Sequence, residues 1–390
     1  MSNNRSVFPS AIGVFLSLLV LGWIPSVFAS RLSPETMAVT QSERPAVEVM
    51  FVLDTTSSMT GLIAAAKDKI WSIANTLASA DPTPDIRMGL VGYRDRGDAY
   101  VTIFTPLSDD LDAVYARLIQ FEAVGGGDTP ESVNQALYEA VTKPDWSSSP
   151  AVYRVIFLVG DAPPKMNYPD DVKYGRSCAW AAQNDIVINT VQCGSMPETA
   201  SIWGEIAQLG RGEAFQVAQS GSAVRYDTPY DEKIAGLSRA LDDTRIYYGD
   251  ADHLREMEAR QKTADEIYSE ARPSAIAKRT IFNSKAAGER NFIGAQELVH
   301  AVESGELDLA EIPQSDLPRE LKGMRGPAMA ALIETRSRER KQLQSQIEDL
   351  ANKRQHFIEN KVRDEKGGGA DSLDTKIYRC IQVQAAQKGI

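Results

Sequence analysis

The sequence predicts an α/β fold in which a doubly wound, mostly parallel sheet is followed by an all-helical C-terminal region. Between residues 46 and 243, short runs rich in Val, Ile, Leu and Phe alternate with runs whose apolar residues recur at helical spacing. The run 153–159 is almost entirely apolar, which is typical of a parallel strand buried on both faces. From about residue 244, strand-like runs stop and charged residues become frequent. We therefore expect a sheet domain over 46–243 and a helical region over 244–390.

The first residues predict a secretory signal peptide. Arg5 precedes an apolar stretch over 11–24, and Val27, Phe28 and Ala29 fit a small-residue cleavage site. The apolar stretch is too short for a comfortable membrane span. We therefore expect a signal peptide over 1–29 that is cleaved after Ala29, a linker over 30–45, and a mature protein that is secreted or periplasmic.

Strands and helices alternate along the expected sheet domain, which favours a parallel sheet covered by helices. The expected strands cover residues 47–53, 85–93, 99–104, 153–159, 186–192 and 213–217, and the expected helices cover 59–77, 111–121, 130–140, 178–183, 199–209 and 230–241. A polar hairpin turn over 94–98 joins the second and third strands. It contains Arg-Gly-Asp, the adhesion peptide that integrins bind, but Asp and Gly here suit the geometry of a turn.

The C-terminal region is expected to hold helices over 254–271, 297–302, 327–366 and 371–388. In the long helix over 327–366, Leu343, Ile347 and Leu350 follow the spacing of a coiled coil, but Arg336 and Arg340 interrupt the pattern upstream. We therefore expect this helix to pack as one member of a hairpin or bundle. Self-association through the C-terminal helices stays open as an alternative.

A strand-to-helix turn near residue 54 carries three oxygen-bearing side chains at alternate positions. Asp54 ends the first expected strand, and Thr56 and Ser58 follow it before the helix begins. An open α/β sheet places its ligand site outside the carboxyl ends of its strands. A carboxylate and two hydroxyls are ligands that suit a hard cation such as Mg²⁺. A Ser or Thr at the start of a helix also serves as an ordinary N-cap, so this turn does not identify the site alone.

The Asp-x-Thr-x-Ser spacing resembles the metal-ion-dependent adhesion site of von Willebrand factor type A domains, whose usual form is Asp-x-Ser-x-Ser. Two further segments match the family in the same order: Gly-Gly-Gly-Asp-Thr over 125–129, which presents Thr129 at the start of a helix, and Gly-Asp over 160–161, which follows a strand. The resemblance implies that Thr129 and Asp161 complete the site. Residues 45–243 are similar to the secreted branch of the family that includes the amino-terminal domain of hemicentin.

The resemblance also implies how such a site works. The hydroxyls bind Mg²⁺, or Mn²⁺ or Ca²⁺, directly, while the carboxylates act mainly through water. The cation then remains electron-poor and accepts an acidic side chain from a partner protein. We therefore expect a protein that binds other proteins and is not an enzyme.

Other features of the composition limit the alternatives. The net charge of −11 gives no indication of a nucleic-acid-binding face. The three histidines lie in the second half of the chain and show no zinc-site spacing. In an exported protein, Cys178 and Cys193 are candidates for a disulfide, which leaves Cys380 either buried and inert or exposed and reactive.

Two other functions remain as alternatives. Asp54 followed by Thr56 resembles the Asp-x-Asp-x-Thr motif of haloacid-dehalogenase-type phosphatases, in which the first Asp is the nucleophile and the second is the general acid. Thr56 stands at the place of that second Asp, so the acid is missing and a metal-dependent phosphatase or hydrolase is disfavoured. The second alternative is a structural envelope protein that assembles through its C-terminal helices.

Overall fold

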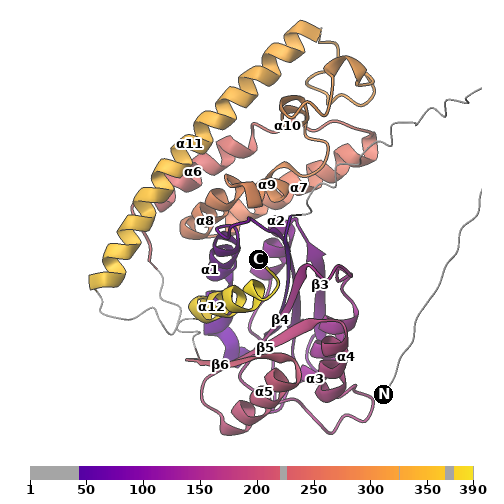
Figure 1. The fold of residues 1–390 in the computed structure, drawn as a ribbon, viewed down its shortest axis with the longest axis vertical. Helices are drawn as coiled ribbons and strands as arrows, with labels where there is room; N and C mark the ends of the chain where they lie inside the picture. The colour runs from indigo at the N-terminus through magenta and orange to yellow at the C-terminus, as the bar shows by residue number, and fades with distance from the viewer. Residues whose placement is uncertain (1–43, 220–225, 325, 365–372, 390) are drawn as a thin grey trace, which may run out of the picture. The chain divides into compact units, whose positions relative to one another are not determined.

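The sheet at the centre of the protein has six strands in the order β3-β2-β1-β4-β5-β6 (Figure 1). The computed structural model describes residues 44–219, 226–324, 326–364 and 373–389. The strands are β1 (Ala46–Asp54), β2 (Asp85–Tyr93), β3 (Thr102–Ser108), β4 (Val152–Gly160), β5 (Ile186–Cys193) and β6 (Arg211–Val217). All are parallel except β3, which pairs antiparallel with β2 at one edge. This confirms the predicted fold class, whereas the predicted signal peptide lies outside the described residues.

Alternate residues of the central strands point to opposite faces of the sheet, and each face is covered by helices. On β1, Val49 and Phe51 pack with α1 (Thr60–Leu77) and α2 (Leu111–Ile119). Met50 and Val52 pack on the other face with α3 (Val133–Thr142), α4 (Tyr174–Gln183) and α5 (Pro197–Leu209). Because β1 and β4 are buried along nearly their whole lengths, the two cores fix the position of both strand ends.

The last helix of the chain, α12 (Leu373–Ala386), packs on the same face as α1 and lies beside α1 and β6 (Figure 1). Ile377, Cys380 and Ile381 are buried in the core of that face. The side-chain amide of Gln384 donates to Asn189 Oδ1 at 2.9 Å, and Asn189 Nδ2 donates to Gln384 Oε1 at 3.0 Å. A helix that the sequence analysis assigned to the C-terminal region therefore forms part of the core of the sheet.

The other C-terminal helices pack on one another and on α1 and α2. They are α6 (Asp231–Asp242), α7 (Ala251–Glu270), α8 (Pro273–Asn283), α9 (Glu289–Ile293), α10 (Leu298–Glu303) and α11 (Gly326–Asp364). Phe282 of α8 contacts Trp71 of α1, with ring centroids 5.7 Å apart. On α11, Ile347 shares a core with Ile234 and Leu241 of α6. Part of the predicted coiled-coil stripe is thus covered within the same chain.

None of the helices in the described residues combines the length and the apolar composition that a membrane span requires.

The predicted disulfide between Cys178 and Cys193 is not formed, which corrects the sequence analysis. Cys178 on α4 packs on one face of the sheet, whereas Cys193 at the end of β5 packs on the other face. Both are buried free thiols, and so is Cys380. Burial raises the pKa of the Cys178 and Cys380 thiols to about 12, so they stay protonated and are poor nucleophiles near neutral pH.

Candidate functional site

Asp54, Thr56 and Ser58 lie together where β1 ends and the short 3-10 turn η1 (Ser57–Met59) leads into α1. Asp54 Oδ1 accepts hydrogen bonds from the backbone N–H of Thr56 at 2.9 Å and from its hydroxyl at 2.6 Å. The oxygen atoms of the Thr56 and Ser58 hydroxyls are 3.2 Å apart. Because the Thr56 hydroxyl already donates to Asp54, Ser58 is the donor in this second bond. The three residues predicted from the first motif therefore form one connected group.

Asp161 lies at the same edge of the sheet because it follows β4, the parallel neighbour of β1. A Cβ atom at Gly160 would lie 3.3 Å from Asp54 Oδ2, which shows how closely the two strand ends approach. Asp161 is also one of the neighbouring charges that raise the pKa of Asp54. The structure therefore brings Asp161 to the predicted group.

Gln219, just beyond the end of β6, joins Ser58 to Asp161. Its side-chain amide donates to Asp161 Oδ2 at 2.6 Å and to the backbone oxygen of Ser58 at 3.2 Å. Gln219 was missed by the sequence analysis because it belongs to no motif. The only available signal was its position after a strand, at the edge where the carboxyl ends of parallel strands meet.

The glycine-rich loop lies against the turn that holds Asp54. Gly125 and Gly126 have φ values of +83° and +79°, a conformation that favours glycine. The backbone N–H of Ser57 donates to the Gly125 oxygen at 3.1 Å, and a Cβ atom at Gly126 would lie 3.0 Å from Thr56 Cβ. The glycines thus allow the loop to approach Thr56 closely.

Thr129 lies on this loop but is exposed to solvent, and it takes no part in the hydrogen bonds among the other four predicted residues. The sequence analysis placed it at the start of a helix. In the structure α3 begins at Val133, and Ser132 is the residue that precedes it. The structure therefore groups four of the five predicted side chains and places Thr129 on the adjacent loop.

Glu131 is a buried carboxyl group of the same region that the sequence analysis did not select. Its backbone N–H donates to the Pro163 oxygen at 3.0 Å, and its backbone oxygen accepts from the N–H of Lys165 at 2.8 Å, which joins its loop to the loop after Asp161. Its Oε2 atom has no hydrogen-bond partner within the described residues. Burial, followed by the charges of Asp54 and Asp95, raises the pKa of Glu131 to about 8.

Asp54 is the most deeply buried carboxyl group of the site, with no exposed surface. Burial raises its pKa to about 7, Asp161 adds to the rise, and the two hydrogen bonds from Thr56 oppose it. The Oδ2 atom has no hydrogen-bond partner among the described residues. A buried carboxylate with one free oxygen is costly unless a positive charge or a donor approaches it.

The donor set is suited to a hard cation bound by oxygen atoms, with two hydroxyls and two carboxylates at one sheet edge. In the part of the chain that the structure describes, no group of three or more His, Cys, Asp or Glu side chains is arranged to hold a metal ion. A site of the proposed kind does not depend on such a group, since half of its donors are hydroxyls.

The Arg-Gly-Asp turn supports the site from outside. Asp98 accepts a hydrogen bond from the backbone N–H of Gly126 at 3.1 Å, and Arg96 pairs with Asp170 at 2.9 Å and with Asp171 at 2.6 Å. Both charged side chains of the tripeptide are thus engaged within the chain, in agreement with its reading as a turn.

Comparisons with known proteins identify the family of the sheet domain. Residues 48–216 match the family model described as von Willebrand factor A domain. Two similar proteins are the von Willebrand factor A domain-containing proteins 7 of Rattus norvegicus and Mus musculus. Each is 33% identical to this chain over 140 residues, and the match covers 36% of this chain and 14% of the relative. The human protein of the same name is 32% identical over 140 residues. The chain therefore spans about a seventh of the length of these relatives.

Among solved structures, one similar chain is the proximal thread matrix protein 1 from the mussel byssus. It has 14% sequence identity and a TM-score of 0.35, and the match covers 45% of this chain and 42% of that one. The narrower resemblance to the hemicentin branch stays a prediction. The family model and the sequence relatives agree with the predicted family, and residues 48–216 of this chain are a von Willebrand factor A domain.

Proposed function

We propose that this protein binds a divalent cation at the edge of the sheet and uses the cation to bind an acidic side chain of a partner protein. Asp54, Thr56, Ser58 and Asp161 would hold the ion, and Thr129 would join them from the adjacent loop. The ion is Mg²⁺, or Mn²⁺ or Ca²⁺. When bound, it supplies a positive charge that attracts a carboxylate.

The observation that carries this proposal is that the Oδ2 atom of Asp54, a carboxylate oxygen without exposure to solvent, has no hydrogen-bond partner among the described residues. This oxygen lies beside Asp161. The other oxygen of Asp54, Oδ1, accepts the hydrogen bond that orients the Thr56 hydroxyl. A cation near Asp54 would remove the repulsion between the two carboxylates. The two hydroxyls are neutral ligands and would leave most of the positive charge available for a partner.

Family membership supports the protein-binding part of the proposal, since von Willebrand factor A domains typically mediate interactions between proteins. The same membership favours a protein that is not an enzyme. Thr56 adds to this, because it stands where a phosphatase of the haloacid-dehalogenase type would need its acid. Hydrolysis of a phosphate ester that is lost in Asp54→Asn would favour the enzymatic alternative instead.

Titration of the purified protein with MgCl₂ in a calorimeter tests the metal part. The wild type is expected to bind one ion, and Asp54→Ala is expected to bind none. Asp109→Ala serves as the matched control, because Asp109 is half exposed and lies at the opposite edge of the sheet, just beyond the end of β3. Equal binding by the wild type and Asp54→Ala would exclude the site.

Affinity capture from the protein's native extract tests the partner part. The wild type is expected to retain a partner in Mg²⁺ and to release it in EDTA, while Asp54→Ala retains none. A partner that Asp54→Ala binds as well as the wild type does, with or without EDTA, would show that binding uses another surface.

We also propose that the protein is exported, on the basis of the predicted signal peptide over 1–29. The protein isolated from its own cells is then expected to begin at Ser30. N-terminal sequencing of this protein checks the expectation, and a chain that still begins at Met1 would contradict it.

A further inference from the structure

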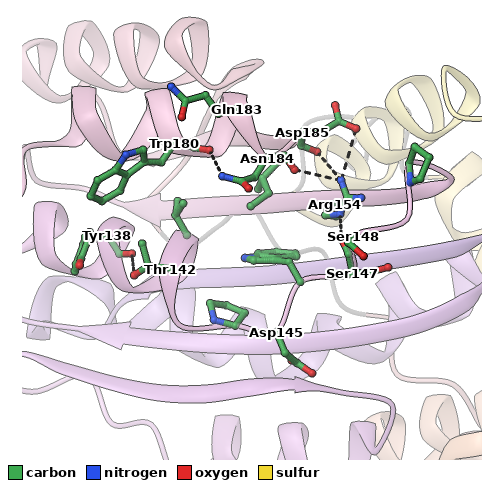
Figure 2. A pocket seen from close by; sticks show the side chains of 15 residues that line it. Tyr138, Thr142, Asp145, Ser147, Ser148, Arg154, Trp180, Gln183, Asn184 and Asp185 are labelled. Carbon is green, nitrogen blue, oxygen red and sulfur yellow. Dashed lines mark hydrogen bonds and ion pairs between the residues drawn. The ribbon is translucent and has the colours of Figure 1, made fainter.

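A second site lies at the opposite edge of the sheet from Asp54, where β4 and β5 begin (Figure 2). It is a cavity of about 750 Å³. This volume is within the range of small-molecule sites in proteins, which is roughly 300–1,000 Å³. The C-terminal ends of α3 and α4 and the loop before β4 form its walls. No residue of the candidate metal site contributes to it.

Three aromatic side chains line this cavity. Tyr138 comes from α3, Trp180 from α4 and Trp146 from the loop before β4. The rings of Tyr138 and Trp180 are 5.7 Å apart and inclined by 46°. All three are only partly buried and line the cavity. The Arg176 guanidinium lies over the Trp180 ring, 4.8 Å from its centroid, so at most one face of this ring is left for a ligand. The cavity therefore offers aromatic faces to a ligand.

The charged groups of the cavity are already paired within the protein. Arg154 is almost fully buried, and each of its three nitrogen atoms donates to a backbone oxygen of the chain. Figure 2 shows the bonds to Ser147 and Asn184. Asp145 accepts two hydrogen bonds of 2.8 Å from Arg87. Asp185 pairs with Lys388 and with Arg154. An ionic ligand would have to compete with these contacts, so the cavity is better suited to an uncharged one.

Uncharged polar groups of the cavity are free to bind. Three of them make no hydrogen bond within the described residues: the hydroxyls of Tyr138 and Ser148 and the side-chain amide of Gln183. Ser148 and Gln183 are also exposed. These groups include both donors and acceptors. A ligand that satisfies them must itself carry both donors and acceptors.

We propose that this cavity binds a neutral saccharide. A sugar ring has C–H groups that pack on the face of an aromatic ring, and its hydroxyls both donate and accept hydrogen bonds. These are the two kinds of contact that the cavity offers. A proline-rich peptide also packs on aromatic rings, but its proline residues lack backbone N–H groups and cannot donate a hydrogen bond to the acceptor of Gln183.

The first experiment presents the mature chain to an array of neutral and anionic glycans. Binding to one or more neutral glycans is expected, and it should persist in EDTA, at high salt, and in the Asp54→Ala variant, because the cavity is separate from the metal site. Failure of the metal proposal therefore leaves this expectation unchanged. Absence of binding to every neutral glycan, or binding confined to anionic glycans, would overturn the proposal.

The second experiment tests the cavity with substitutions, using the neutral glycan that binds best. Gln183→Ala is expected to weaken binding about threefold to tenfold, the effect of one hydrogen bond. Trp180→Ala is expected to weaken it at least about tenfold, and Trp180→Phe to restore part of the loss, since an aromatic face returns. Gln208→Ala, an exposed glutamine on the neighbouring α5, is the matched control and should bind as the wild type does.

Circular dichroism of each variant separates loss of the site from loss of the fold. A folded Trp180→Ala variant with unchanged affinity would place the glycan elsewhere and overturn the proposal. Tighter binding of a proline-rich peptide than of any glycan at this cavity would do the same.

Discussion

The carboxyl group of Asp54 is fully buried. Its Oδ1 atom accepts two hydrogen bonds, and its Oδ2 atom accepts none among the described residues. We expect Asp54→Asn to be at least as stable as the wild type in EDTA, with a gain of up to about 1 kcal/mol in the free energy of unfolding, because the amide keeps the acceptor for Thr56 and removes a charge beside Asp161. Addition of Mg²⁺ should then raise the midpoint of urea unfolding for the wild type and not for Asp54→Asn. Asp109→Asn is the control and should behave as the wild type does.

The metal-free protein is expected to lose stability as the pH rises from about 5 to about 8. The pKa of Asp54 is raised from 3.8 to about 7, and that of Glu131 from 4.5 to about 8. The unfolded chain has the ordinary values, so in this window the folded state holds protons that the unfolded state has released. Stability falls with pH wherever the folded state binds more protons.

Urea unfolding in EDTA across this pH range checks the expectation. Glu131→Gln should reduce the dependence on pH, because it removes one of the two groups. The pKa of Asp95 and of Asp242 is lowered, so these carboxyl groups titrate below the window and do not affect the outcome. An increase in stability toward pH 8 would contradict the pKa values given for the two buried acids.

The candidate site was predictable in the parts that strand ends determine. Asp54, Thr56 and Ser58 occupy one turn, and Asp161 follows a neighbouring strand, so local sequence and parallel pairing bring them together. Glu131 and Gln219 were not predictable, because their places depend on the path of long loops. Thr129 shows the same limit, since no local rule determines how a glycine-rich loop directs its side chain.

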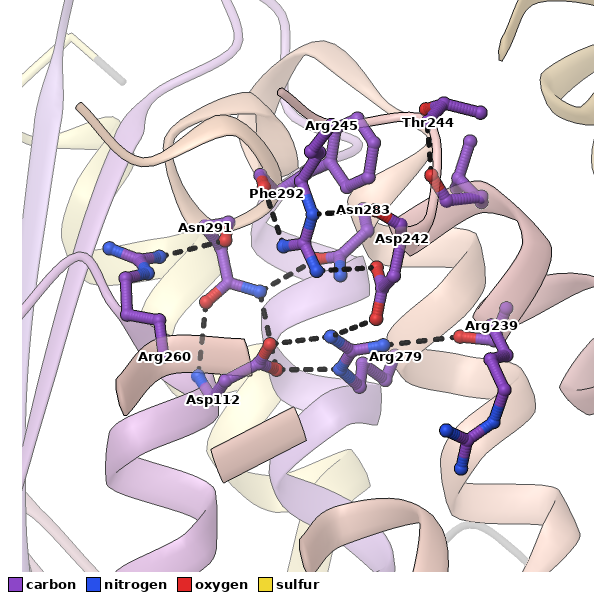
Figure 3. Close-up of polar contacts among 12 residues, drawn as sticks. Asp112, Arg239, Asp242, Thr244, Arg245, Arg260, Arg279, Asn283, Asn291 and Phe292 are labelled. Carbon is purple, nitrogen blue, oxygen red and sulfur yellow. Dashed lines mark hydrogen bonds and ion pairs between the residues drawn. The ribbon is translucent and has the colours of Figure 1, made fainter. Parts of the chain in front are cut away.

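At the scale of elements, a buried arginine of α8 is one of the contacts that join the C-terminal helices to the sheet domain (Figure 3). Arg279 has no exposed surface and donates two hydrogen bonds to Asp112 of α2, at 2.6 and 2.7 Å. It also donates to Asp242 of α6 at 3.1 Å, to Ser238 at 3.1 Å and to the Tyr268 hydroxyl at 3.0 Å. All five N–H groups of the guanidinium therefore have partners.

Removal of this arginine is expected to be strongly destabilising. Arg279→Ala leaves the buried carboxylate of Asp112 without its cation and leaves Asp242 with Arg245 alone, and removal of one partner of a buried ion pair typically costs about 3–5 kcal/mol. Arg255→Ala is the matched control, because Arg255 pairs with Asp252 at the surface, where such a pair contributes about 0–1 kcal/mol. Urea unfolding of both variants measures the difference. Similar losses in the two would mean that the buried cluster contributes little.

The sequence analysis predicted most strands and helices but omitted α8. Its neighbours were recognisable from long apolar periodicity, whereas α8 has eleven residues, and two of its buried side chains are Arg279 and Asn283. Polar residues at buried positions interrupt the helical spacing of apolar residues from which a helix is predicted. The third strand was also displaced, from the expected 99–104 to Thr102–Ser108, because the hairpin turn is longer than the polar segment suggested.

For the molecule as a whole, the described residues between 44 and 389 form a single compact unit. The boundary predicted at residue 243 would divide it, since α8 and α12 both pack on the sheet domain. We expect a fragment over 44–243 to lack a cooperative unfolding transition, because Trp71 loses its contact with Phe282 and Tyr153 loses its contact with Gln384.

Circular dichroism during thermal unfolding, compared with the chain over 44–390, checks this expectation. Val383→Ala in the longer chain is the control for α12, because Val383 is 57% exposed and should tolerate the change within about 0.5 kcal/mol. A fragment over 44–243 that unfolds cooperatively at the same temperature as the longer chain would show that the helices are an independent addition.

The position of α12 affects the order in which the protein is completed during synthesis. The ribosome makes this helix after all six strands, yet its apolar side covers strands that were made much earlier. A nascent chain that ends before residue 373 therefore exposes one side of its sheet and depends on chaperones or on delayed collapse to avoid aggregation. Folding of the sheet domain is expected to finish only after residues 373–386 have been made.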